Sequence, residues 1–204
     1  MCEEREMEKY SVEELATILG ALEEVLGSDV AGQFRRGEIE ISVREALGLL
    51  APSAPIMIGP LSNVFSSEFF SEDNPDVKLY IQDKFKERIL AVAKKVSKKP
   101  AVSLVSRDLT KPMSDSEICA EIPSNHLFSI DDLWMVAELI SRQSNGESGA
   151  LLLNGFANLF YFQVGASIIV VHVSCGGSGW SVSDWDLDEY GQWYDGDRVF
   201  SRNG

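Results

Sequence analysis

The chain has 204 residues, with 18 Lys and Arg against 32 Asp and Glu, so its formal charge at pH 7 is −14. Apolar residues make up 45% of it and charged residues 25%, the proportions of a folded globular domain rather than of a disordered acidic tail. The negative balance argues against a general nucleic-acid binder and against attachment to an anionic membrane.

The first 50 residues are predicted to be helical. Ser11-Val12-Glu13-Glu14 has the form of a capping box, and apolar residues follow it at spacings of three and four. This pattern predicts an amphipathic helix over residues 12–26 that ends at Gly27. Shorter helices are expected over residues 28–36 and 42–50. Residues 1–50 either pack on the rest of the domain or form a separate arm.

Two further helices are predicted in the middle of the chain. Asn74-Pro75 is a good helix start, and an apolar stripe with spacings of three and four follows it as far as Pro100. The stripe consists of Val77, Ile81, Phe85, Ile89, Val92 and Val96. The second helix begins at Ser129-Ile130-Asp131-Asp132 and runs to about residue 144. Its inward-facing residues are Leu133, Val136, Ala137 and Ile140.

Strands are expected on either side of these helices. The proline-rich segment 51–60 suits a short edge strand or a connector, and segments 101–106 and 118–122 suit strands. After Gly149, short β-rich runs alternate with glycine-containing turns. These strands are predicted over residues 150–154, 158–164, 167–175, 179–187 and 198–202. Asp195-Gly196 predicts a hairpin between Trp193-Tyr194 and Val199-Phe200.

The resulting fold class is α+β. Residues 1–204 form a single domain in which an antiparallel β-meander, residues 149–202, packs against amphipathic helices from the N-terminal three quarters. Residues 159–162 and 168–171 are apolar at every position, so both faces of the middle strands should be covered.

The cysteines and the termini bear on the compartment. Cys2, Cys119 and Cys175 are an odd and widely spaced set, with only His126 and His172 to join them, which is typical of neither a disulfide framework nor a zinc site. The N-terminus is acidic, and no apolar stretch approaches the roughly 20 residues of a membrane-spanning helix. We therefore expect a cytoplasmic protein with no cofactor and no membrane contact.

Chemistry-bearing side chains concentrate in residues 184–197, here named the acidic stretch. It holds six carboxylates, no basic residue, and several aromatic residues. Aromatic rings among carboxylates are typical of a surface that recognises a protein or a sugar, although each tryptophan could instead complete the core. We expect partner binding by Asp186, Asp188, Tyr190 and Trp193. The partner is expected to be another protein, and the charge of the stretch favours a basic one.

A divalent-cation site is an alternative function for the same stretch. Asp184, Asp186, Asp188 and Asp195 occupy the first, third, fifth and twelfth positions of a calcium-like loop. Glu189 stands where such a loop needs glycine for its sharp turn, and the twelfth ligand is Asp instead of a bidentate Glu. A solvated acidic hairpin that blocks edge pairing explains the same residues.

A Cys/His hydrolase is the third possibility. Cys175 follows an apolar strand, as the reactive residue of a nucleophile elbow would, but Val173 replaces the required glycine and a strand rather than a helix follows. Residues three apart on a strand face opposite ways, so His172 cannot serve Cys175 and only His126 remains. A non-enzymatic protein-interaction module is therefore the leading hypothesis, as a monomer or a homodimer.

The predicted helix after Asn74 is basic. Residues 75–99 contain eight basic and three acidic side chains, so this segment carries +5 and the remainder of the chain −19. The basic side chains scatter around the helix instead of clustering, which disfavours a nucleic-acid interface. They could instead pair with the acidic stretch, within the fold or within a dimer.

Overall fold

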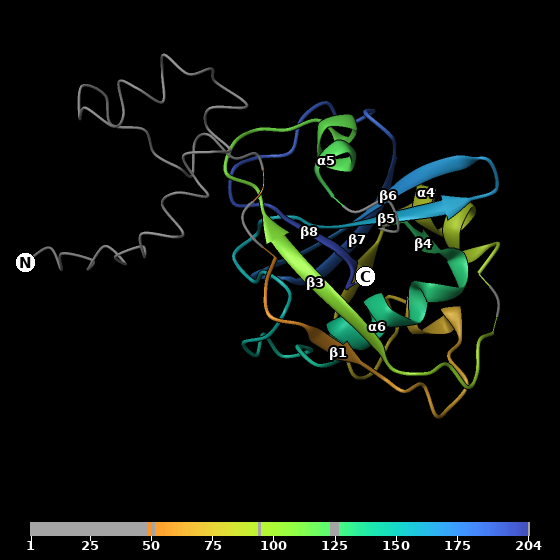
Figure 1. Cartoon of the computed structure of the whole chain (residues 1–204). Coiled ribbons are helices and arrows are strands. Elements are labelled where there is room, and N and C mark those ends of the chain that lie inside the picture. Colours follow the sequence, from red (N-terminus) through yellow and green to blue (C-terminus); the bar gives the residue numbers. More distant parts are fainter. Residues whose placement is uncertain (1–48, 50–51, 94, 123–126, 204) are drawn as a thin grey trace, which may run out of the picture. The chain divides into compact units, whose positions relative to one another are not determined.

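The structure is a computed structural model that describes residues 49, 52–93, 95–122 and 127–203 (Figure 1). These residues belong to the second of the two units into which the chain divides, residues 48–204. Apart from residue 49, the helices predicted over residues 12–26, 28–36 and 42–50 lie outside the described residues. His126 also lies outside them.

The described residues form a mixed sheet of eight strands. The strands are β1 (Ile56–Ile58), β2 (Leu79–Ile81), β3 (Val102–Asp108), β4 (Phe128–Ser129), β5 (Asn158–Val164), β6 (Ser167–Gly176), β7 (Gly179–Asp186) and β8 (Arg198–Arg202). Their order is β1-β3-β8-β5-β6-β7-β2, and β4 pairs with β5. The pairs β2·β7, β4·β5 and β5·β8 are parallel, and the other pairs are antiparallel. The α+β class is thus confirmed, but the sheet is not purely antiparallel.

The path from β7 to β8 corrects the predicted hairpin. β8 does not pair back on residues 193–194; it lies between β3 and β5, in the same direction as β5 and β7. A connection between parallel strands must cross a face of the sheet. Residues 187–197, here named the crossover loop, therefore pass over the sheet. Asp195-Gly196 does form a turn, in which the Asp197 amide donates to the Tyr194 carbonyl at 3.0 Å.

The segment 150–154 forms no strand, contrary to the prediction. Its backbone amides bond to buried side chains and not to a neighbouring strand. The Leu151 amide donates to Gln143 Oε1 and the Leu152 amide to Asn158 Oδ1, both at 2.8 Å. β5 and β8 have the predicted bounds, and β6 and β7 differ from them by one residue. The predicted edge strand near residue 56 is β1, and the strand after residue 101 is β3.

Both faces of the sheet are covered, as the apolar pattern of its middle strands predicts. On β5, Phe160 and Phe162 belong to one buried cluster, together with α6 (Leu133–Ser141). Leu159 and Tyr161 belong to the other, together with Ile118 of α5 (Asp115–Glu121). These are named the α6 face and the α5 face, and Figure 1 shows the two helices on opposite sides of the strands. No helix of the described residues is long and apolar enough to cross a membrane.

The helix predicted to follow Asn74 is much shorter than expected. Among the described residues of this segment, only α4 (Asp83–Phe85) and a π-helical turn (Lys86–Leu90) are helical, while residues 79–81 form β2. A spacing of four also fits the two-residue period of a strand, and Leu79 supplies the intervening buried position. Most of the stripe is nevertheless buried, with Val92 exposed.

Of the other two α-helices in the described residues, one was predicted from the sequence and the other was not. The helix predicted from residue 129 is a 3₁₀ turn (Ile130–Asp132) followed by α6, with the four expected inward residues buried. The strand predicted over 118–122 is wrong, because α5 occupies that segment. Ser114 and Glu117 form the capping box that starts α5, a pattern readable in the sequence as Ser-Asp-Ser-Glu.

Candidate functional site

A buried carboxylate holds the crossover loop against the α5 face. Asp115, the first residue of α5, is 1% exposed. It accepts hydrogen bonds from Tyr161 Oη at 2.8 Å, from Trp193 Nε1 at 2.6 Å and from the Asp188 amide at 2.8 Å. Hydrogen bonds to a charged group contribute about 1.5–3 kcal/mol each, and unsatisfied buried donors are costly. Asp115 is therefore the principal internal support of the loop.

Trp193 is fixed in three further ways. Its amide and carbonyl exchange hydrogen bonds of 2.8 and 3.0 Å with Met113, just before α5. Tyr190 stacks on its indole with ring centroids 4.4 Å apart and an interplanar angle of 14°. The ring of His172, on β6, lies 5.6 Å from it. Trp193 is thus buried and supports Tyr190, which is 40% exposed and stacks on the indole ring.

Lys84 of α4 and Arg88 of the π-helical turn form ion pairs with the first carboxylates of the acidic stretch. The guanidinium of Arg88 donates to both oxygens of Asp186, and its Nη1 lies 3.4 Å from Asp184 Oδ2. Lys84 Nζ lies 2.5 Å from Glu189 Oε2 and 3.6 Å from Asp186 Oδ2. The basic segment therefore pairs with the acidic stretch within the fold, one of the two arrangements expected from the sequence.

The protonation equilibria of these carboxyls differ with their surroundings. The hydrogen bonds from Arg88 lower the pKa of Asp186, and the hydrogen bond from Lys84 lowers the pKa of Glu189. Burial raises the pKa of Asp184, which is fully buried and accepts no hydrogen bond from the described residues. The hydrogen bonds from Ser116 lower the pKa of Asp188.

The four residues predicted to bind a partner have different roles. Trp193 is 2% exposed and belongs to the core, so it supports a surface instead of forming one. Asp186 is engaged by Arg88, and Asp188 accepts hydrogen bonds from the Ser116 amide and hydroxyl. Tyr190 alone combines exposure with an aromatic ring. Tyr194, 60% exposed, also lies on the loop.

The four aspartates of the cation hypothesis do not gather round one point. Asp184 and Asp186 face Arg88, Asp188 faces Ser116 at the start of α5, and Asp195 is exposed in the turn before β8. Within the described part of the chain, no group of three or more His, Cys, Asp or Glu side chains is placed to hold a metal ion. The geometry gives the cation hypothesis no support.

The residues of the hydrolase hypothesis are also separated. Cys175 belongs to the α6 face, and burial raises the pKa of its thiol. His172 faces the other side, where its Nδ1 lies 3.0 Å from Ser183 Oγ, and burial lowers its pKa to about 4. Cys119, on α5, has a pKa raised to about 12, mainly by burial. None of these thiols has the lowered pKa of a reactive nucleophile.

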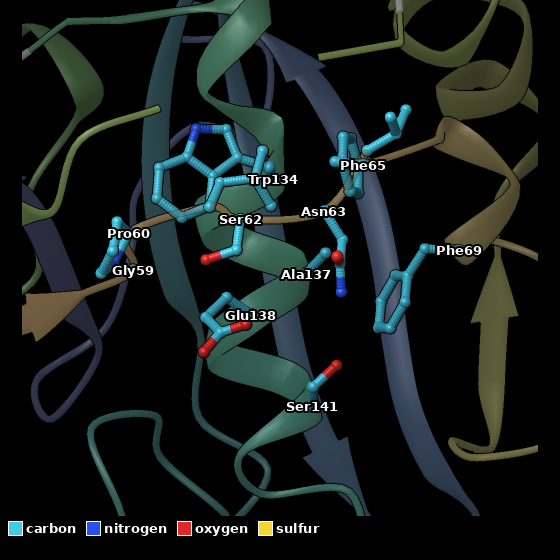
Figure 2. A pocket seen from close by; sticks show the side chains of 12 residues that line it. Gly59, Pro60, Ser62, Asn63, Phe65, Phe69, Trp134, Ala137, Glu138 and Ser141 are labelled. Atoms are coloured by element: carbon cyan, nitrogen blue, oxygen red, sulfur yellow. The ribbon is translucent and has the colours of Figure 1, made fainter. Parts of the chain in front are cut away.

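A groove of about 350 Å³ lies between α6 and residues 59–69 (Figure 2). Ala137, Glu138 and Ser141 line one wall, and Glu138 is already bound by Arg142 at 3.0 Å. Trp134 is buried and its Nε1 has no hydrogen-bond partner among the described residues, but in Figure 2 this nitrogen lies on the side of the ring away from Ser62 and Glu138. The polar groups of the groove therefore do not converge.

The crossover loop is consequently the better candidate. Sequence reasoning identified its residues but missed Asp115, its internal support. The signal for Asp115 was present in the capping box at 114–117, which places this carboxylate in the first turn of a helix. Comparison with protein-family models, with curated proteins and with solved structures finds no match to this chain.

Proposed function

We propose that this protein is a non-enzymatic interaction module whose crossover loop binds a basic segment of another protein. The main support for this proposal is that exposed aromatic rings are concentrated on and beside the crossover loop. Four aromatic side chains are exposed in the described residues: Tyr80, Phe156, Tyr190 and Tyr194. Two of them belong to the loop, and Phe156 packs beside Gly196 within it. Aromatic anchors supply much of the binding energy at protein interfaces.

The support beneath the loop favours binding. Asp115, Met113 and Trp193 hold the loop from below through hydrogen bonds, so Tyr190 loses little conformational freedom when a partner arrives. A preorganised aromatic ring avoids part of the entropy cost of association, which is about 0.5–1.5 kcal/mol for each side chain that must be immobilised.

Charge favours a basic partner. The acidic stretch has six carboxylates and no basic residue, on a chain of net charge −14. Lys84 and Arg88 compensate only its first part, and Asp195 forms no ion pair with any described residue. Such a surface accelerates encounter with a basic partner and repels an acidic one. The cytoplasmic location expected from the cysteine pattern belongs to this proposal; Cys119 and Cys175 are free thiols.

A displayed library of peptides that vary in net charge and in aromatic content tests the proposal. We expect the selected peptides to be positively charged, and Tyr190→Ala to weaken their binding at least tenfold. Tyr80→Ala is the matched control, because Tyr80 is 43% exposed against 40% for Tyr190 but lies on β2. The proposal fails if selection yields no basic peptide, or if the two substitutions weaken binding equally.

A further inference from the structure

The contacts of Lys84 resemble those of a bound ligand. Its ammonium group lies 2.5 Å from Glu189 Oε2, 3.6 Å from Asp186 Oδ2 and 5.9 Å from the centroid of the Trp185 ring. Two carboxylates and an aromatic face together provide the ion pairing and the cation–π attraction that recognise an ammonium ion.

The walls of this site do not depend on Lys84. Glu189 Oε2 also accepts a hydrogen bond from the Asp186 amide at 2.9 Å. Asp186 is held by both terminal nitrogens of Arg88, and Trp185 is fixed on β7 opposite Val170 and packs edge-on against Tyr190 at 5.1 Å. Removal of the lysine would therefore leave a preformed site.

The site is also short of positive charge. Three carboxylates, of Asp184, Asp186 and Glu189, face the two cations Lys84 and Arg88. The Asp184 carboxylate is fully buried among them and accepts no hydrogen bond from the described residues. An incoming cation thus meets a local excess of negative charge. Lys84 itself is 36% exposed, and ion pairs between exposed groups contribute little because solvent screens them, so its exchange costs little.

We propose that Trp185, Asp186 and Glu189 form a receptor for a lysine side chain of the partner protein, which Lys84 of the same chain occupies until the partner displaces it. The inference rests on the proposed function and deepens it, because it names the side chain that the basic partner contributes. Lys84 then acts as an internal competitor that weakens binding.

The test uses the full chain and the capped tripeptide acetyl-Gly-Lys-Gly-amide, followed by NMR titration of the Trp185 indole signal. We expect Lys84→Ala to bind the tripeptide about three to six times more tightly than the unsubstituted chain, because a competitor held only by exposed ion pairs lowers the affinity by no more than that factor. Lys84→Ala combined with Glu189→Gln should lose that gain, and the tripeptide with an Nε-acetylated lysine should not bind. Lys95→Ala is the control, because Lys95 is an exposed lysine that lies outside this cluster.

The receptor is refuted if Lys84→Ala, shown to be folded by a cooperative thermal transition, gains no affinity. It is also refuted if Lys95→Ala gains as much, or if the acetylated tripeptide binds equally well. These failures are distinct from failure of the proposed function: basic peptides selected through Tyr190 would still establish the interaction surface, with a residue other than lysine in contact with Trp185.

Discussion

The two ends of the acidic stretch are held by different kinds of interaction. On the α5 face, the buried Asp115 carboxylate accepts hydrogen bonds from the buried side chains of Tyr161 and Trp193 and from the partly buried Asp188 amide. At the end of β7, Lys84 and Arg88 form ion pairs with carboxylates, of which Asp186 and Glu189 are half exposed. Buried donors are costly to leave unpaired, whereas solvent screens exposed pairs. The inner support should therefore determine stability, and the outer pairs should be exchangeable.

Removal of the inner carboxylate should have the largest effect. Asp115→Ala leaves the indole N–H of Trp193 buried without its acceptor and removes one partner of the Tyr161 hydroxyl, and we expect it to lower the free energy of unfolding by about 4 kcal/mol. Asp115→Asn, which retains one acceptor oxygen, should cost about half as much. Urea titration followed by tryptophan fluorescence measures both, because all four tryptophans lie in the described unit.

Asp131→Ala is the matched control, since Asp131 is a half-exposed carboxylate 3.9 Å from Lys99. It should change the free energy of unfolding by less than about 0.5 kcal/mol. Equal losses for Asp131→Ala and Asp115→Ala would remove the distinction between the two supports.

The second prediction concerns pH on the inner side. Burial lowers the pKa of His172 from its ordinary 6.5 to about 4, so the unfolded chain takes up a proton at a higher pH than the folded chain does. The stability that the neutral ring contributes is present above pH 6.5 and is lost as pH falls toward 4, a change on the order of 3 kcal/mol. Unfolding titrations at half-unit intervals across this range should show the decline.

His172→Gln should abolish that decline, since the amide does not titrate and can still bond to Ser183. His126→Gln, which changes the other histidine of the chain, should leave it in place. If His172→Gln and the unsubstituted chain lose stability in parallel, the carboxylates and not the buried ring govern the acid response.

Local sequence patterns predicted where the strands and helices lie better than they predicted which strands pair with one another. The bounds of β5 and β8 follow from short β-rich runs with turn residues on either side, and Asp195-Gly196 does form a turn. Which strand β8 joins depends on contacts that the sequence separates widely: Trp193 Nε1 and Asp115 are 78 residues apart. The same limit applies to the site. Aromatic and acidic composition identified the stretch, but burial of Trp193 and pairing of Asp186 with Arg88 arise only when distant segments meet.

The third prediction compares the two outer cations. Arg88→Met leaves the buried Asp184 without its nearest cation, and we expect a loss of about 1–2 kcal/mol at pH 7. Lys84→Met breaks only exposed pairs and should cost less than about 1 kcal/mol. Burial raises the pKa of Asp184 and Arg88 opposes that rise, while the hydrogen bonds from Arg88 lower the pKa of Asp186, so the cost of Arg88→Met should shrink as pH falls and these carboxyls take up protons.

Salt separates the outer pairs from the inner support in the same measurements. Raising the ionic strength from 0.1 to 1 M shortens the Debye length from about 10 to 3 Å. The cost of Lys84→Met should then nearly vanish, while that of Asp115→Asn should stay unchanged. A salt-dependent cost at Asp115 would mean that water reaches the inner support.

A small effect is expected at Asp188, where the two supports meet. Its backbone has φ 60°, a conformation that Asn also tolerates, and its amide donates to Asp115 whatever the side chain. Asp188→Asn removes one negative charge but keeps an acceptor for the Ser116 amide, so the free energy of unfolding should fall by less than about 1 kcal/mol. Asp188→Gly relieves the backbone and loses the side-chain bonds, which should nearly cancel. Should Asp188→Asn cost as much as Asp115→Asn in urea titration, the side chain of Asp188 rather than its backbone would carry the inner support.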